Sequence, residues 1–405
     1  MSNDYPFEIG SLNNAATGDA LPSVADTGGE LTPFEYSRPL AEYPTATEIA
    51  MFLQRRDKAR HIYTRDLNVN GRAVQEAMDK YLASGDFYPS SALKEALKSP
   101  LHLYYYKESG WREALEKYQR NKEYFDLGTF LHQSILEPTK FSRAIVEPGL
   151  PMNTKEGVAG LISFWTDKVS EAENAKELLI QADNEVMSLG LDMNKIDGMR
   201  AKYKALKAVS GLSSVTAEHK AIIDIVKFNY DRYGDGMFYE LLKHSKREIS
   251  LYYCDPETGL KLRIRPDAMQ FAENIGTDTI ISVKSTRQDD LQAFYNDTVR
   301  LNYGLSEGMY LDVASKVTGR DFRSTIMIML QTTPPYGVAA LVWSAEDLEI
   351  GKYRYRQALQ TVADCKASGL YPAYDAFAQS GNMGLIDMKQ PGWNAKDLLP
   401  QDIEN

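Results

Sequence analysis

Hydrophobic periodicity changes abruptly at Glu248, and this change limits the possible folds more than any other pattern in the sequence. Upstream segments carry apolar residues at helical spacing, whereas EISLYYC, KLRIRPDAMQF and TIISVKS have the alternation expected of strands. The turn DPETG suits a tight connection between the first two strands, which predicts a hairpin. Two further segments, STIMIMLQ and GVAALVWS, predict buried strands. We therefore expect a mainly helical N-terminal half and a sheet in the C-terminal half.

The segments that follow these strands predict helices. A long helical stretch comes after the third strand and is predicted to break near Gly304, and a final helix ends at Gly369. The order of three strands, a helix, two strands and a helix predicts an α/β sheet domain wrapped by helices rather than a helical bundle.

Composition divides the chain into four regions. Residues 1–40 are rich in Gly, Ser, Ala, Asn, Asp and Pro and predict a disordered arm, and residues 41–85 predict a small helical accessory segment. Residues 86–380 form the predicted main domain, with a helical insertion at about 155–240. Residues 381–405 are predicted to be a C-terminal tail.

Bulk charge and cysteine content narrow the function classes. The 405 residues include 46 Lys and Arg against 56 Asp and Glu, so a net charge of −10 argues against polyanion binding unless basic residues gather on one face. Cys254 and Cys365 are isolated, which indicates neither a disulfide framework nor a zinc site and suits a reducing compartment. No signal peptide or transmembrane segment is recognisable, so we expect a soluble, cytoplasmic protein without membrane association.

Two of the predicted strands carry polar residues at alternate positions. In the second strand these share one face: Lys261, Arg263, Arg265 and Asp267. In the third strand Ser282 and Lys284 share a face, opposite Val283. If the two strands pair, Asp267 and Lys284 converge at one end of the sheet. A carboxylate beside a lysine suits metal-assisted phosphodiester hydrolysis, although the spacing alone favours an ordinary cross-strand ion pair.

Several segments, in a fixed order, resemble one branch of a known nuclease superfamily. They are YPSSALKEALKSPLHLYY, LGTFLHQSILEP, EISLYYCDPETGLKLRIRPD, RPDAMQF with TIISVKST, and TPPYGVAAL with YRQALQTVADCKASGLYPAY. Together they resemble the RecE-type (exodeoxyribonuclease VIII) branch of the PD-(D/E)XK nucleases, which is similar to RecB-family and lambda-type exonucleases. The resemblance covers about residues 88–376. It implies a restriction-endonuclease-like α/β fold with a mixed central sheet flanked by helices.

The resemblance also implies an activity. It points to a Mg²⁺- or Mn²⁺-dependent exonuclease that acts on double-stranded DNA ends in phage or bacterial recombination, inside a bacterial cell or a phage-infected host. The implied reaction is processive, runs 5′ to 3′, and leaves a 3′ single strand for a single-strand annealing protein. A ring-shaped homo-oligomer is carried over by analogy only.

The same resemblance assigns roles to particular residues. His132, Asp267 and the backbone carbonyl of Val283 would bind the metal ion, and Lys284 would position or activate the attacking water. Glu248 matches a family acid near the site and would bind a second ion or orient a ligand. Tyr310 corresponds to the tyrosine of the family's QxxxY helix motif.

Two positions depart from the family pattern. The metal-binding acid expected two residues before Lys284 is Ser282, and the glutamine expected before Tyr310 is Ser306. A neutral hydroxyl is a poor Mg²⁺ ligand beside a carboxylate, so another acid is needed for full ion binding. Asp278 shares the face of Ser282 but lies too far along an extended strand. We therefore hypothesise that Glu248 or Glu307 is the replacement ligand.

Other candidate residues have simpler explanations. A single histidine among Phe130, Leu131 and Ile135 is commonly a packed helix residue, but its place in the GTxxH pattern favours a ligand role for His132. Four arginines are candidate DNA-binding residues, against the alternative of a solvated strand edge: Arg263, Arg265, Arg287 and Arg300.

Three functions remain open from the sequence. The leading one is the exonuclease, and the second is a catalytically impaired relative that binds DNA or a partner without cleavage. The third is a structural protein that reuses the fold, which the acidic charge and the N-terminal segments favour. Ser282 is the feature that separates the first two.

Overall fold

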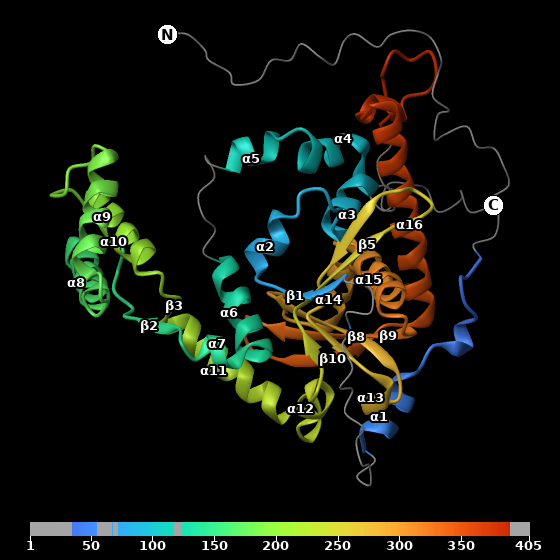
Figure 1. Cartoon of the computed structure of the whole chain (residues 1–405), viewed down its shortest axis with the longest axis horizontal. Helices are drawn as coiled ribbons and strands as arrows, with labels where there is room; N and C mark the ends of the chain where they lie inside the picture. The colour runs from blue at the N-terminus through green and yellow to red at the C-terminus, as the bar shows by residue number, and fades with distance from the viewer. Residues whose placement is uncertain (1–34, 55–66, 68–71, 117–123, 389–405) are drawn as a thin grey trace, which may run out of the picture.

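A computed structural model describes residues 35–54, 67, 72–116 and 124–388 of the chain (Figure 1). Most of the predicted N-terminal arm and the end of the C-terminal tail lie outside these ranges. None of the helices within them is both long and apolar enough to cross a bilayer.

A five-stranded central sheet forms the core of the molecule. Its strand order is β10 (Val338–Val342), β9 (Phe322–Gln331), β8 (Asp278–Thr286), β7 (Ala268–Gln270) and β4 (Lys246–Arg247). Strands β8 and β9 are parallel and the other neighbours are antiparallel, so the sheet is mixed. The α/β fold class predicted from the sequence is therefore confirmed.

A second, three-stranded sheet contains the predicted hairpin. Its order is β1 (Ala73–Gln75), β5 (Ile249–Cys254) and β6 (Lys261–Ile264), and all pairs are antiparallel. The prediction of one continuous strand through KLRIRPDAMQF is wrong, because the chain leaves this sheet after Ile264 and enters the central sheet as β7. The helical segment predicted at residues 41–85 also contributes strand β1 to this sheet.

Helices cover both faces of the central sheet. On one face lie α3 (Ser90–Lys98), α15 (Tyr303–Thr318) and α16 (Ala345–Ser368), which share a core with Ile280 and Met269. Because alternate residues of a strand point to opposite faces, Ser282 and Lys284 point toward these helices as well.

The opposite face of the sheet packs against α6 (Tyr124–Leu136), α11 (Ala217–Arg232) and α12 (Met237–Leu242). Their apolar residues form a second core with Ile281 and Val283 of β8. Strand β8 is thus buried between two helical layers, which explains its nearly continuous apolar sequence.

Several other helical elements are short or lie at the periphery of the fold. They are η1 (Leu40–Glu42), α1 (Ala46–Gln54), α2 (Met78–Ala83), α4 (Pro100–Leu103), η2 (Tyr104–Glu108), α5 (Trp111–Glu116), α7 (Pro138–Phe141), η3 (Tyr233–Asp235), α13 (Ala272–Ile275) and η4 (Tyr374–Phe377).

The long helical stretch after β8 breaks earlier than predicted. Helix α14 (Leu291–Arg300) ends before Asn302, which has a left-handed backbone with φ of 48°, and α15 begins at the next residue. Gly304 lies inside α15, where a side chain on Gly351 of α16 would collide with its backbone. Gly351 therefore permits the close packing of the two helices, and Gly304 does not break α15.

The helical insertion predicted at about 155–240 corresponds only in part to a separate module, because α11 and α12 of this stretch pack against the central sheet. Helices α8 (Lys155–Ser170), α9 (Ala175–Ser188) and α10 (Ile196–Ser210) form a three-helix module with its own apolar core, and the module stands apart from both sheets (Figure 1). A parallel pair, β2 (Ile145–Glu147) and β3 (Ser214–Thr216), joins it to the rest of the chain.

The first described residues are packed against the main domain. The Ser37 hydroxyl donates a hydrogen bond of 2.9 Å to the buried Glu349 carboxylate, and Arg38 forms an ion pair with Asp321 at 2.7 Å. The predicted disordered arm therefore does not extend to residues 35–40.

Candidate active site

The pairing of β7 with β8 brings Asp267 to the middle of β8. Ala268 is opposite Ile281 in the antiparallel register, and the backbone N–H of Val283 donates a hydrogen bond of 2.5 Å to Asp267 Oδ2. Burial would lower the pKa of Lys284, but the negative charges of Asp267 and Glu307 outweigh it and raise the pKa. Asp267 and Lys284 thus converge as predicted, although the pairing of β7 with β8 brings them together and Asp267 does not belong to the alternating strand β6.

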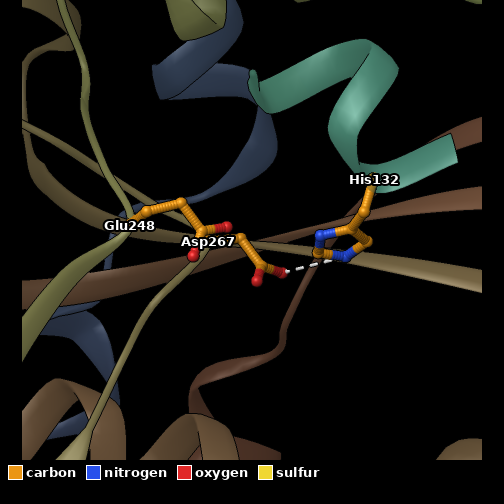
Figure 2. Close-up of side chains that lie close together, drawn as sticks. All are labelled: His132, Glu248 and Asp267. Carbon is orange, nitrogen blue, oxygen red and sulfur yellow. Dashed lines mark ion pairs between the residues drawn. The ribbon is translucent and has the colours of Figure 1, made fainter. Parts of the chain in front are cut away.

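His132 on helix α6 faces the same point from the other side of the sheet. Helix α6 approaches β8 closely at Gly128, where a side chain would meet the hydroxyl of Ser285. One turn later, His132 Nε2–H donates a hydrogen bond of 2.8 Å to the Val283 carbonyl oxygen and lies 3.6 Å from Asp267 Oδ2 (Figure 2). The alternative of a histidine packed among apolar residues is therefore wrong.

Glu248 is the second acid at this point. Its backbone is left-handed, with φ of 55°, and the ligand atoms of His132, Glu248 and Asp267 all lie within 4.8 Å of one another (Figure 2). Burial raises the pKa of Glu248, although Arg265 Nε donates a hydrogen bond of 2.8 Å to its carboxylate. The Glu248 carboxylate thus pairs with Arg265 and also lies where it could bind a cation together with His132 and Asp267.

Glu307 on α15 approaches the site from the face of β8 that packs against α3, α15 and α16. The Ser282 hydroxyl donates a hydrogen bond shared between its two carboxylate oxygens, at 2.9 and 3.0 Å. The side chain is only 1% exposed, and this burial raises the pKa of Glu307 to about 7, against the opposing effects of Lys284 and Ser282. A carboxylate therefore lies beside the position where the motif acid is missing.

This set of donors fits a divalent cation. Carboxylate and carbonyl oxygens suit Mg²⁺ and Mn²⁺, and an imidazole adds affinity for Mn²⁺. Ligands in an octahedral Mg²⁺ site lie about 2.9 Å apart when the bonds are ~2.1 Å long. The hydrogen bond of 2.8 Å between His132 Nε2 and the Val283 oxygen is close to that spacing, so both atoms would bind one ion once Nε2 has lost its proton. His132, Asp267 and Val283 would hold the ion, and Glu248 or Glu307 would complete its anionic ligands.

Comparisons with known proteins agree with this geometry. Residues 89–382 match the family described as "PDDEXK-like domain of unknown function (DUF3799)", which covers most of the chain. The chain belongs to this PDDEXK-like family. No curated protein matches the sequence.

One solved structure that resembles the PDDEXK-like protein comes from Eubacterium rectale and is described as a "Putative exonuclease". It is 9% identical, covers 78% of this chain and 96% of that chain, and has a TM-score of 0.42. A likeness at this level carries no argument about activity.

The PDDEXK-like family supports a nuclease-type fold and, with it, the use of a divalent metal ion. The family assignment does not extend to the RecE-type branch, so the finer resemblance remains a proposal.

Two of the four candidate DNA-binding arginines are internal in this PDDEXK-like protein. The Arg263 guanidinium donates to backbone carbonyls at the end of α2, including that of Ser84 at 3.0 Å, and the residue is 8% exposed. Arg265 pairs with Glu248 and also donates to the carbonyl of Glu76 at 3.0 Å. The prediction that both point from an open sheet face is wrong, because the end of α2 covers Arg263 and because Arg265 lies beyond the end of β6, where it binds Glu248.

The other basic candidates are exposed. Arg287 follows β8 on the surface, and Arg300 at the end of α14 forms an ion pair of 2.8 Å with Asp297. Their contact with DNA remains a prediction. Asp278 lies away from the site, where it binds Arg320 at 2.7 Å.

Helices α3 and α15 contribute two further groups to the site. Tyr310 shares a hydrogen bond with Ser90, and burial raises its pKa well above the usual value. Lys94, which the sequence interpretation overlooked, lies near Lys284 and Glu307. No pattern within its own segment marks Lys94, because its place in the site depends on the packing of α3 and α15 on one face of the sheet.

Proposed function

We propose that this PDDEXK-like protein is a divalent-cation-dependent exonuclease that hydrolyses phosphodiester bonds at the ends of double-stranded DNA. The observation that carries the hydrolytic part is the convergence of His132, Asp267 and the Val283 carbonyl beside Lys284. The preference for duplex ends rests on the resemblance to RecE-type exonucleases, as do the annealing partner and the ring.

The proposed reaction transfers a phosphoryl group to water. The water oxygen attacks phosphorus, one bridging P–O bond breaks, and the leaving oxygen takes up a proton. When bound, the divalent cation would polarise a phosphate oxygen and lower the pKa of a water ligand. The remaining steps depend on residues of the chain itself.

Lys284 acts in this proposal as a cation. Because Asp267 and Glu307 raise the pKa of Lys284, the side chain carries a positive charge in the protein without a metal ion. Its ammonium group orients the water or stabilises negative charge on the phosphate oxygens. Asp267 is held in place by the Val283 N–H, which fixes the carboxylate for ion binding.

Glu307 takes the role of the missing motif acid. Its carboxylate is oriented by the Ser282 hydroxyl, so Ser282 supports the ligand rather than binding the ion itself. This arrangement favours an active enzyme over a catalytically impaired relative, because the number of anionic ligands is preserved.

The test is cleavage of an end-labelled linear duplex, with the same sequence as a closed circle, in Mg²⁺ or Mn²⁺. We expect shortening of the linear duplex only, and loss of shortening in Lys284→Ala. Lys316→Ala is the matched control, because Lys316 lies on the surface of α15 and pairs with Asp312. Tight binding without shortening would instead support the impaired relative. Cutting of the circle would contradict the requirement for ends.

A further inference from the structure

Lys94 points from helix α3 toward the candidate active site. Its Nζ lies 5.0 Å from the centre of the Tyr303 ring, and Lys284 Nζ lies 5.8 Å from the centre of the same ring. Two lysines from distant parts of the chain therefore share one aromatic neighbour. Ser90, one helical turn before Lys94, reaches Tyr310 in the same site.

Neither ammonium group has a carboxylate within ion-pair distance among the described residues. By contrast, Lys98, one turn further along α3, is exposed and pairs with Glu95 at 2.7 Å. Lys94 is half-buried, and burial together with the positive charge of Lys284 lowers its pKa to about 8, against the opposing effect of Glu307. In the part of the chain that the structure describes, Lys94 thus lies close to a second cation without a carboxylate within ion-pair distance of its own ammonium group.

An anion from outside the chain would offset the repulsion between Lys94 and Lys284. Lysine binds phosphate as a compact point charge, and an aromatic face beside the ammonium adds a cation–π attraction. Within the proposed function, the anion available at this place is the phosphate backbone of the substrate.

We infer that Lys94 is a second phosphate-binding residue of this site, which holds a backbone phosphate of the strand that Lys284 engages. The inference rests on the proposed function and deepens it. Lys94 is a positioning residue for the nucleic acid, and it contacts neither the metal ligands nor the attacking water.

The experiment measures binding of a short fluorescent DNA duplex to the full chain in Ca²⁺, between 50 and 200 mM salt, with the duplex checked for integrity. Loss of one phosphate contact reduces the slope of log affinity against log salt by about 0.9. Between these concentrations the wild-type affinity should therefore fall about 3.5-fold more than that of Lys94→Gln. Lys98→Gln should keep the wild-type slope, and Lys94→Arg should restore it.

A structural role for Lys94 would give another result. If the charge of Lys94 only supports the fold, Lys94→Gln lowers the unfolding temperature and leaves the salt slope unchanged, which overturns the inference. Lys94→Met keeps most of the aliphatic part of the side chain but removes its charge. It serves as a second variant, and we expect it to have the same reduced salt slope as Lys94→Gln. Failure of the wild-type protein to bind duplex would overturn the proposed function as well. Tight binding with an unchanged slope in both variants overturns this inference alone.

Discussion

The Ser282 hydroxyl of β8 donates a hydrogen bond shared between both carboxylate oxygens of Glu307 on α15, at 2.9 and 3.0 Å. The serine stands where the motif acid is expected, and in the proposed site the acid that it binds replaces that ligand. The same carboxylate acts on Lys284, whose pKa it raises together with Asp267. The site therefore keeps its acidic character although the motif residue has changed.

Removal of the Glu307 charge should disable the site. We expect Glu307→Gln to weaken Mn²⁺ binding, measured by calorimetry, and to slow DNA cleavage by roughly 100-fold or more, since even supporting partners of metal ligands contribute about 10- to 100-fold. Ser282→Ala, which removes only the supporting hydroxyl, should cost roughly 10-fold. Glu218→Gln changes an exposed acid on α11 and should behave as wild type.

Glu248 is the competing candidate for the replacement ligand, because it lies in the same cluster as His132 and Asp267. If Glu248→Gln loses the ion and Glu307→Gln does not, the assignment moves to Glu248. If both variants bind Mn²⁺ like wild type, neither acid replaces the missing ligand.

Protonation of Glu307 should affect stability in the absence of divalent ions. Burial raises the pKa of Glu307 to about 7, so the neutral form stabilises the fold. That contribution is fully present below the ordinary pKa near 4.5 and is lost as the pH rises through 7. Glu307→Gln stays neutral and should be more stable than wild type at pH 8 by about 3 kcal/mol at most.

The pH dependence distinguishes this effect from general repacking. Thermal unfolding in EDTA should show the advantage of Glu307→Gln shrinking to about 1 kcal/mol at pH 5, where wild-type Glu307 is mostly protonated. An advantage that is equal at pH 5 and pH 8 would show that titration of Glu307 is not its cause.

His132 should couple ion binding to stability. A ligand that binds only the folded protein stabilises it by about 2.7 kcal/mol at 100 times its Kd. Mn²⁺ should therefore raise the unfolding temperature of wild type. His132→Gln can still donate a hydrogen bond to the Val283 carbonyl but loses the imidazole ligand, so most of this increase should disappear. His219→Gln on α11 should retain it, and an equal increase in both variants would remove His132 from the ion site.

Arg265 should be needed for the fold rather than for DNA binding. Its side chain is 8% exposed and pairs with Glu248, which is 14% exposed. Arg265→Met leaves that carboxylate without its partner and should reduce the free energy of unfolding by roughly 3 kcal/mol. Arg300→Met changes a side chain that is 68% exposed and should cost less than about 0.5 kcal/mol. If the Arg265→Met protein were fully stable but bound DNA more weakly, the result would support the prediction that Arg265 contacts DNA.

Periodicity predicted the strands of the sheet domain and most of its helices. It could also place Ser282 and Lys284 on one face of β8, because alternation depends only on local geometry. It could not locate the end of β6, since the residues from Arg265 to Asp267 keep an apparent alternation while they cross between two sheets. The misplacement of Arg265 follows from that crossing, whereas Arg263 is buried because the end of α2 packs over β6.

Only some of the site residues can be predicted from the sequence. His132 and Asp267 lie in recognisable motifs, whereas the choice between Glu248 and Glu307 depends on how α15 packs across β8. Lys94 was missed for the same reason. Its proximity to Lys284 arises from packing of α3 and α15 on one face of the sheet, which no pattern within either segment reveals.

The most direct measurement is anomalous diffraction from crystals of the wild-type protein soaked in Mn²⁺. A peak within coordination distance of His132 Nε2, the Asp267 carboxylate and the Val283 carbonyl oxygen is the expected result, and the peak should be absent from Asp267→Asn crystals. No peak at this position, or a peak that contacts neither His132 nor Asp267, would contradict the metal-dependent nuclease.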